Sequence, residues 1–368
     1  MQFGLFSLTT LSQPRGDTDR LIGETRAEVR LAEDLEFDVA WFAEHLFSNY
    51  SITTSPLLLV AHMAQATSRI QLGPAVVVLP FYEPIRLAED VCLVDSLTGG
   101  RLVLGLGFGY QPREFIKFAI PFEERYARGV EAWDMIEQAV TGRIDHHGTH
   151  TNATVEVAVT ATRPHIPTFV VGSDPGVMSL VAARRATPFV TPGLQPLSAA
   201  QRMRDNYAAV YGEPMPFAMQ RYVFVSDDAG ERRAAAEQVR NVARMAGNLR
   251  SLQPAMTGAH LERPALDNEP SLDEIEAGAL IGTASQITER IVTEATALSL
   301  SHLSCFMRLA DMPHDVAMRS IERFGSDVIP AVHKELLGRD SARSTFAPER
   351  GGGEVGVSGP SGGSDSRR

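Results

Sequence analysis

Two adjacent side chains with acid–base capacity, Glu44 and His45, directly follow an apolar run from Val39 to Phe42. The run is typical of a buried strand, and parallel sheets bind ligands beyond the carboxyl ends of their strands. Histidine is the side chain whose charge changes near neutral pH, which suits it to proton transfer. From position alone, a catalytic role and a structural role for His45 both remain open.

A GxGxG segment, Gly105 to Gly109, ends a second apolar run that begins at Arg101. The dinucleotide fingerprint is GxGxxG, and Gln111-Pro112 stands where the helix of that motif should begin. A dinucleotide site is therefore a weak interpretation. Glycines at the end of a strand also permit the close approach of a flat ring or a phosphate, which we prefer.

A third segment, Val170 to Val177, predicts a strand, a turn and the start of a helix. Backbone N–H groups at such a helix start can bind an anion. The alternative is simple N-capping by Ser173 or Asp174. Asp174 is unfavourable beside a phosphate, which favours the capping interpretation.

Histidines cluster at His146, His147 and His150, but no cysteine joins them in the sequence. Gly148 suggests a turn between two strands, so we predict no metal site. No GxSxG elbow occurs between a strand and a helix either, which disfavours serine-hydrolase chemistry.

Repeated strand-then-helix units must position these residues. Eight alternating units favour a closed (β/α)8 TIM barrel, with a doubly wound open sheet as the alternative. The expected strands are 3–8, 38–42, 70–79, 101–106, 168–171, 189–191, 217–225 and 302–308. The expected helices are 18–35, 56–66, 84–97, 123–140, 176–185, 197–211, 229–246, 285–297 and 315–324.

Three segments depart from this repeat, which we expect to occupy residues 1–335. An insert at about 110–160 ends in an alternating polar and apolar run typical of a half-exposed hairpin strand. Residues at about 247–280 form a long Pro-, Asn- and Glu-rich connection that suggests a mobile active-site lid. The Gly-, Ser- and Arg-rich tail, 338–368, is expected to be disordered.

The composition of the chain indicates which binding partners and which cellular compartment to expect. The net charge of −11 argues against nucleic acid or an anionic membrane as the main partner. No apolar run reaches the roughly 18 residues of a membrane span, and the N-terminus lacks the basic region of a signal peptide. Cys92 and Cys305 lie in apolar segments, which suits a reducing cytoplasm.

The chain resembles the bacterial luciferase-like flavin monooxygenases over about residues 1–335. The resemblance is carried by MQFGLF, LEFDVAWFAEHLF and TSRIQLGPAVVVLPFYEPIRLAEDVCLVDSLTGGRLVLGLGFG. PTFVVGSDP, GTASQITERI and MRSIERFGSDVIPAV support it. It implies a (β/α)8 barrel of the luciferase-like type with an extra segment after the fourth strand. It also implies a reduced flavin that reacts with oxygen at the carboxyl ends of the strands.

The resemblance also assigns the site. His45 falls on the family's catalytic histidine, with Glu44 beside it, and Ala75-Val76 falls on a non-proline cis peptide that packs behind the flavin ring. The implied cofactor-binding residues are Ala75, Val76, Gly107, Phe108, Gly109, Ser173, Asp174, Gly176 and Val177.

Two departures concern the flavin phosphate. Phe108 stands where the catalytic subunit of luciferase has a phosphate-binding arginine, and Asp174 replaces a serine of the phosphate loop. We therefore expect weak, transient binding of reduced FMN.

The expected function is a two-component monooxygenase that receives reduced FMN from a separate NAD(P)H:flavin reductase and oxygenates a small organic substrate. A deazaflavin-dependent oxidoreductase that transfers hydride is the first alternative. A non-catalytic partner subunit of a luciferase-like heterodimer is the second, which His45 disfavours. The resemblance also predicts a homodimer formed through helices two and three, where residues 84–97 carry Glu89 and Asp90.

Overall fold

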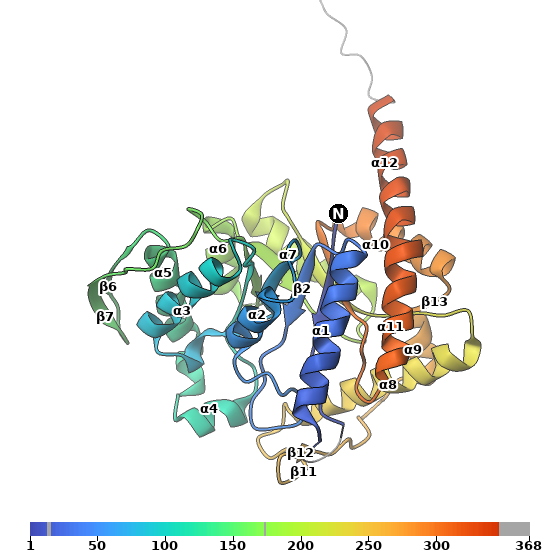
Figure 1. Cartoon of the computed structure of the whole chain (residues 1–368), viewed down its shortest axis with the longest axis horizontal. Coiled ribbons are helices and arrows are strands. Elements are labelled where there is room, and N and C mark those ends of the chain that lie inside the picture. The colour runs from blue at the N-terminus through green and yellow to red at the C-terminus, as the bar shows by residue number, and fades with distance from the viewer. Residues whose placement is uncertain (13–15, 173, 346–368) are drawn as a thin grey trace, which may run out of the picture.

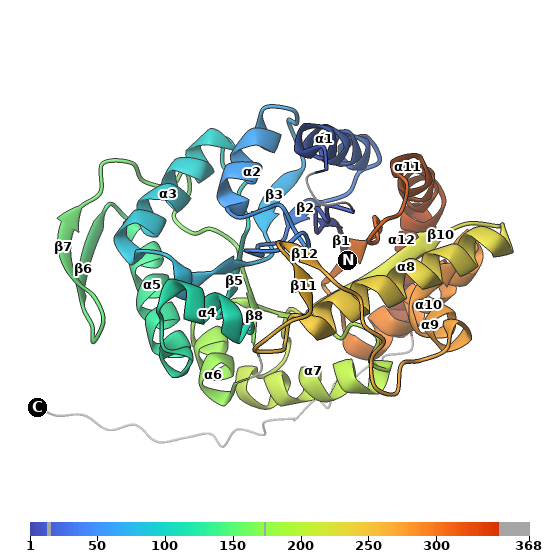
Figure 2. The same cartoon turned by 90° about the horizontal axis from the view of Figure 1, so that it is seen from below.

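The protein is an α/β barrel (Figure 1), seen in a computed structural model that describes residues 1–12, 16–172 and 174–345. One parallel sheet has the strand order β3-β2-β1-β14-β10-β9-β8-β5-β4, with β13 paired to β10. An isolated parallel bridge joins Leu72 of β3 to Leu102, which lies just before β5 near the other end of this order. Helices surround the sheet (Figure 2), so the fold is the expected (β/α)8 TIM barrel.

The barrel strands are short, buried and parallel, as near-continuous apolar runs predict. They are β1 (Gln2–Ser7), β2 (Val39–Phe42), β3 (Gln71–Pro74), β4 (Val77–Val78), β5 (Leu104–Gly107), β8 (Thr168–Val171), β9 (Thr187–Val190), β10 (Ala218–Val225) and β14 (His302–Phe306). The outer helices are α1 (Thr18–Asp34), α2 (Pro56–Ala64), α3 (Pro84–Leu97), α5 (Arg125–Ala139), α6 (Pro175–Ala183), α7 (Leu197–Tyr211), α8 (Ala229–Asn248), α10 (Ala284–Leu298), α11 (His314–Arg323) and α12 (Ile329–Thr345). No helix in the described part of the chain is both long and apolar enough to cross a membrane.

The structure differs from the sequence-based expectation in several places, and α12 is the longest element that was not expected. The strand expected over 70–79 is divided into β3 and β4 at a cis peptide between Ala75 and Val76. A short helix, α4 (Pro112–Phe118), follows β5, and a short strand, β13 (Leu280–Gly282), extends the sheet beside β10. Residues 338–345, expected in the tail, continue α12, and residues 346–368 lie outside the described residues.

The insert after β5 contains α4, α5 and an antiparallel hairpin of β6 (Arg143–His147) and β7 (Asn152–Glu156). The three clustered histidines lie at this hairpin. His146 is next to Glu131 and His150 next to Glu124, both through single ion-pair contacts. Among the described residues, no group of three or more His, Cys, Asp or Glu side chains is arranged to hold a metal.

The segment expected as a lid crosses the carboxyl end of the barrel. It contains the hairpin β11 (Met256–Thr257) and β12 (His260–Leu261), which lies over the open end of the barrel in Figure 2, and α9 (Leu272–Gly278). Asn49 holds the hairpin, because its amide oxygen accepts from Leu261 N at 2.7 Å and its backbone N–H donates to Ala259 O at 2.9 Å.

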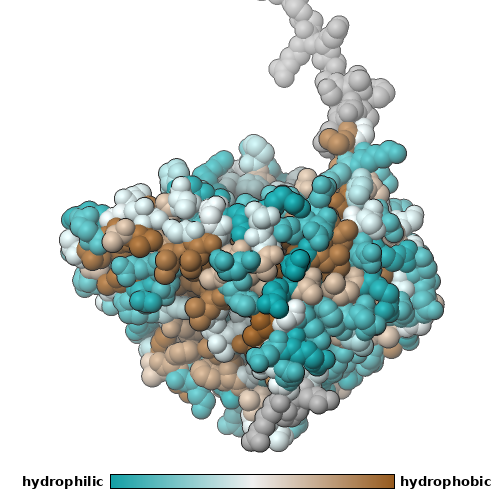
Figure 3. Space-filling view, in the orientation of Figure 1, coloured by the Kyte–Doolittle hydropathy of each residue, from teal (hydrophilic) through white to brown (hydrophobic). Residues whose placement is uncertain are grey.

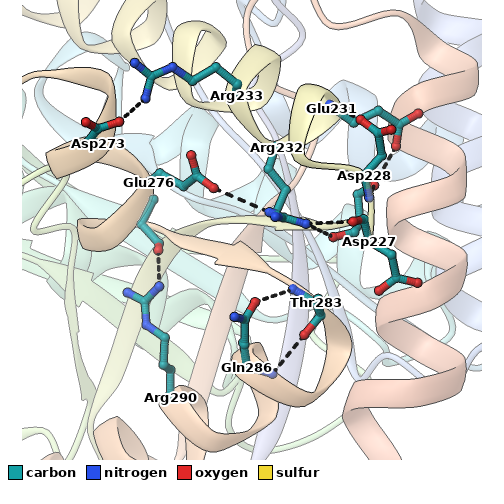
Figure 4. Close-up of polar contacts among 12 residues, drawn as sticks. Asp227, Asp228, Glu231, Arg232, Arg233, Asp273, Glu276, Thr283, Gln286 and Arg290 are labelled. Carbon is teal, nitrogen blue, oxygen red and sulfur yellow. Dashed lines mark hydrogen bonds and ion pairs between the residues drawn. The ribbon is translucent and has the colours of Figure 1, made fainter.

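Ion pairs hold the other end of this segment to the barrel (Figure 4). Arg232 of α8 lies 3.4 Å from Glu276 of α9, and Arg233 pairs with Asp273. Arg290 of α10 donates to the carbonyls of Ala279 at 2.6 Å and Ala277 at 2.8 Å. These contacts anchor α9, while the hairpin lies over the barrel mouth.

Candidate functional site

A cavity of about 330 Å³ opens at the carboxyl ends of the barrel strands, the position expected for ligands in this architecture. Residues from β1, β4, β5, β8, β9, β10 and β14, and from the loops after β2 and the other strands, form its wall. The lining residues are Phe6, Leu8, Ala43, Glu44, His45, Tyr50, Ala75, Val76, Val78, Gly107, Phe108, Gly109, Tyr110, Glu114, Tyr126, Val171, Gly172, Phe189, Thr191, Gln220, Tyr222 and Phe306.

At one wall of the cavity, formed by Ala75, Val76 and Gly107 and called the flat wall below, backbone segments approach each other closely. The Ala75–Val76 peptide is cis, as the family resemblance implied, and both residues line the cavity. A Cβ atom at Gly105 would lie 2.2 Å from Pro74 O, and one at Gly107 would lie 2.4 Å from a methyl of Val76. Only glycine lets β5 approach this segment, which leaves a flat surface that fits a planar ring.

His45 faces the cavity between two tyrosines. The ring centre of His45 lies 4.8 Å from that of Tyr50 and 6.2 Å from that of Tyr110. Its Nδ1 is 2.8 Å from Nε2 of Gln111, so an amide that donates there leaves the ring proton on Nε2. Burial lowers the pKa of His45 to about 4, and the imidazole is therefore neutral at neutral pH.

Glu44 supports the same wall from behind. Its carboxylate accepts from Val78 N at 2.7 Å and from the Tyr82 hydroxyl at 2.8 Å. Burial raises the pKa of Glu44 to about 8, against the effect of these two hydrogen bonds. Glu44 thus holds the chain just after the cis peptide, which suits a positioning role better than direct proton transfer.

A second buried carboxyl, Glu114 of α4, lies close enough to raise the pKa of Glu44. Its carboxylate accepts from Leu46 N at 3.0 Å, next to His45 in the chain. Burial raises the pKa of Glu114 to about 7. Two carboxyls therefore support the His45 loop from opposite sides.

Of the residues expected near the flavin phosphate, Phe108 lines the cavity, whereas Asp174, Gly176 and Val177 do not. Phe108 is 4% exposed, and its ring lies 5.4 Å from that of Tyr126 and against Gly129 of α5. Asp174 caps α6, because its carboxylate accepts from Gly176 N at 2.8 Å, so this N–H is already occupied. Val177 is buried against Gly172, and Ser173 lies outside the described residues.

A cation lies beside this wall. The guanidinium carbon of Arg125 is 4.2 Å from the ring centre of Tyr126, which lines the cavity. The same guanidinium covers Phe122 at 4.1 Å and donates to Phe122 O at 2.9 Å. Arg125 therefore places a positive charge against Tyr126, one of the residues that line the cavity.

Several lining residues were not predicted. Gln220 and Tyr222 alternate along β10, so inward-facing positions of the expected strand 217–225 could have identified them. Tyr50, Tyr110 and Glu114 lie on loops or on α4, where no periodic pattern indicates a direction. Their approach to His45 depends on how these loops fold.

The comparison with family profiles identifies the family of this chain. The profile of a family described as luciferase-like monooxygenase matches residues 1–301. The chain is 30% identical over 355 residues to the uncharacterized protein y4vJ of Sinorhizobium fredii, covering 93% of this chain and 100% of that protein. It is also 26% identical to the oxygenase component of flavin-dependent trigonelline monooxygenase from Acinetobacter baylyi, over 52% of this chain and 54% of that protein.

Solved structures support the fold. The monooxygenase RslO1 from Streptomyces bottropensis superposes with a TM-score of 0.78 at 21% identity, over 90% of this chain and 99% of its own. The oxygenating constituent of 3,6-diketocamphane monooxygenase from Pseudomonas putida, in complex with FMN, gives 0.72 at 18%, over 90% and 98%. The coenzyme F420 dependent tetrahydromethanopterin reductase from Methanopyrus kandleri gives 0.67 at 17%, over 89% and 98%. At these identities, the likeness concerns the fold.

Proposed function

The chain belongs to the luciferase-like monooxygenase family, and we propose that it uses reduced FMN and oxygen to oxygenate a small organic substrate. The observation that carries this proposal is His45 facing a cavity with one flat wall formed by Ala75, Val76 and Gly107. A planar ring against that wall would lie in the same cavity as the imidazole. Bound reduced flavin would supply the electrons for oxygen activation, and we propose the cytoplasm as its compartment.

We assign each residue a role in this chemistry. His45 moves a proton at Nε2, the ring nitrogen left without a partner by the Gln111 contact among the described residues. Glu44 and Glu114 position the segments on either side of His45 through Val78 N and Leu46 N. The aromatic lining, including Phe6 and Phe306, excludes water from the cavity.

We propose that a separate NAD(P)H:flavin reductase supplies the reduced flavin. A similar protein is named an oxygenase component, which supports a two-component arrangement. The GxGxG segment of this chain also forms the flat wall and is not followed by a dinucleotide-type helix start at the right spacing.

Weak FMN binding is the first expected result. Phe108 offers no cation, and Asp174 occupies an N–H of the α6 start, so the phosphate lacks a strong partner on that side. We expect the purified protein to be colourless and to bind reduced FMN with a Kd in the micromolar range or weaker.

The Phe108→Arg variant should bind FMN roughly 10-fold to 100-fold more tightly, and its affinity for riboflavin should not change, because only FMN carries the phosphate. Anaerobic flavin titration measures both affinities.

Phe108→Met is the matched control, since it removes the ring without adding a charge, and thermal melting shows whether each variant folds. Equal effects on FMN and riboflavin would mean that the phosphate lies elsewhere, with Arg125 as the next candidate. A yellow protein that purifies with stoichiometric FMN would contradict the weak-binding proposal.

A deazaflavin-dependent oxidoreductase is the second candidate function. The phosphate-side residues that disfavour tight FMN binding support it, as does the fold shared with an F420-dependent reductase. Oxygen uptake with reduced FMN, compared with turnover of reduced deazaflavin under nitrogen, separates the two functions. A non-catalytic subunit remains the least favoured, because His45 faces the cavity.

We also propose a homodimer formed through α2 and α3. In the single chain Glu89 is exposed and Asp90 pairs with Arg86 at 3.1 Å, so the carboxylates alone do not require an interface. Exposed leucines carry the argument instead: Leu58 is 72% exposed, Leu93 45% and Leu97 47%. Figure 3 shows hydrophobic side chains on the surface that α2 and α3 cover.

Light scattering should therefore give about twice the 40.0 kDa chain mass at micromolar concentration. Leu93→Glu should shift the protein toward monomer, because a charge in an apolar interface costs several kcal/mol. Val210→Glu, on the exposed face of α7, introduces the same charge as a control. A wild-type mass near 40.0 kDa would refute the dimer.

A further inference from the structure

The side of the cavity opposite the flat wall is formed by β10 and its neighbours. The flat wall lies where β3, β4 and β5 meet. In the strand order, β9 and β8 separate β10 from β5, while β14, β1 and β2 separate it from β3. Because the Leu72–Leu102 bridge joins β3 to the segment before β5, β10 lies across the barrel from the flat wall. A planar ring on the flat wall therefore turns its free face toward β10, and the organic substrate lies between them.

Gln220 of β10 is a polar group at the deep end of this side. It lines the cavity two residues before Tyr222, which is nearer the mouth because the cavity opens at the carboxyl ends of the strands. Deeper still, Trp41 and His302 close the barrel, with Trp41 Nε1 donating to His302 Nε2 at 2.9 Å. Within the described chain, no residue forms a hydrogen bond with the Gln220 side-chain amide.

A second polar group without a partner lies beside Gln220. Ser304 of β14 is opposite Gln220 in the parallel register and is 0% exposed, and its hydroxyl has no hydrogen-bond partner among the described residues. The nearby lining is aromatic, with Phe6, Phe189 and Phe306. Buried polar groups normally have a partner, so these two neighbours indicate a hydrogen-bonding ligand at the deep end of the cavity.

The charges around the cavity favour an uncharged ligand group there. None of the described residues that line the cavity is a lysine or an arginine. An ionised group at Gln220 would meet only neutral amide and hydroxyl partners. Burying an unpaired charge costs far more free energy than burying a neutral polar group.

We propose that Gln220 binds an amide-type group of the organic substrate, a carbonyl beside an N–H, on the face of the flavin ring turned away from the flat wall. The inference rests on the proposed function, since it names the substrate class of the same cavity. Gln220 Nε2 donates to the substrate carbonyl, and Gln220 Oε1 accepts from the substrate N–H. A ketone pairs only with Nε2 and leaves Oε1 buried without a donor, which weakens its binding. The substrate is then a neutral amide or lactam on an otherwise apolar body.

The test uses the full-length protein without flavin or oxygen, with benzamide and the similarly shaped ketone acetophenone as probes. Gln220→Met keeps the length of the side chain and removes the amide. In calorimetric titration it should weaken benzamide about tenfold and acetophenone about threefold, because two hydrogen bonds are lost in the first case and one in the second. Benzoate, which adds a charge, should bind wild-type protein more weakly than benzamide does.

Thr191→Val is the matched control, since it removes the hydroxyl of another lining residue, just after β9, and should leave both affinities unchanged. Thermal melting shows whether each variant folds, and Gln220→Leu replaces the methionine variant if that one unfolds. Nuclear magnetic resonance locates the probe: the side-chain amide signals of Gln220, identified by their absence from the variant, should shift when benzamide binds.

The inference is overturned by wild-type protein that binds neither probe or prefers benzoate, or by Gln220→Met that leaves benzamide unchanged or weakens both probes equally. The same loss in Thr191→Val would also overturn it. Benzamide that binds without shifting the Gln220 signals would leave water as the partner of Gln220 and Ser304. Because no flavin chemistry enters these measurements, their failure leaves the monooxygenase proposal standing, and a failure of oxygen activation leaves them readable.

Discussion

Replacing His45 with alanine is expected to slow oxygenation by about 10²–10⁴-fold, the usual contribution of a general acid–base group. The reason is that His45 is the neutral imidazole in the cavity, held through Nδ1 by Gln111 and flanked by Tyr50 and Tyr110. The variant keeps Ala75, Val76 and Gly107, which form the flat wall, so the affinity for reduced FMN should change little. Single-turnover kinetics with reduced FMN, together with flavin titration, measure the two quantities separately.

His62→Ala is the matched control, because it removes an imidazole from an exposed position on α2. Thermal melting of both variants separates loss of chemistry from loss of folding. Unchanged turnover in His45→Ala, or a variant that only unfolds, would return His45 to a structural role.

Gly105→Ala is expected to lower the free energy of unfolding by about 3 kcal/mol, the upper range for overpacking a well-packed site. The added Cβ would lie 2.2 Å from Pro74 O, which is backbone and cannot move aside as a side chain can. The strain would also displace the flat wall, so the affinity for FMN and riboflavin should fall together. Urea denaturation and flavin titration measure the two effects.

Gly23→Ala is the control substitution, and it should have the opposite effect on stability. Gly23 lies within α1, and a Cβ there meets nothing within 4 Å, so the substitution should stabilise the protein by about 0.5–1 kcal/mol. A Gly105→Ala protein with unchanged stability and flavin affinity would contradict the close approach of β5 to the Pro74–Ala75 segment.

Most of the barrel could be predicted because its strands and helices carry strong periodic patterns. The helix expected over 197–211 matches α7 in both bounds, and that over 84–97 matches α3. Two of the missed elements are short: α4 has seven residues and β13 has three, too few for a pattern to appear. The long helix α12 was also missed, because it continues into the segment whose composition predicted a tail. β13 forms because β10 extends beyond β14 and offers Val223 to Val225 as a pairing edge.

The site could be predicted where a family motif marks it and not where loops assemble it. Ala75 and Val76 were expected on the cis peptide, and the structure has it there. Tyr50 and Gln111 come from two separate loops, and their meeting at His45 depends on contacts such as that of Asn49 with the lid hairpin. Local sequence patterns do not predict contacts between loops that are far apart in the chain.

Rapid mixing of the anaerobic protein–reduced FMN complex with oxygen tests the central claim most directly. The account predicts that the protein changes the rate at which oxidised FMN appears, compared with free reduced FMN, and that His45→Ala largely abolishes this difference. Reoxidation at the rate of free flavin, with hydride transfer from reduced deazaflavin under nitrogen, would contradict it.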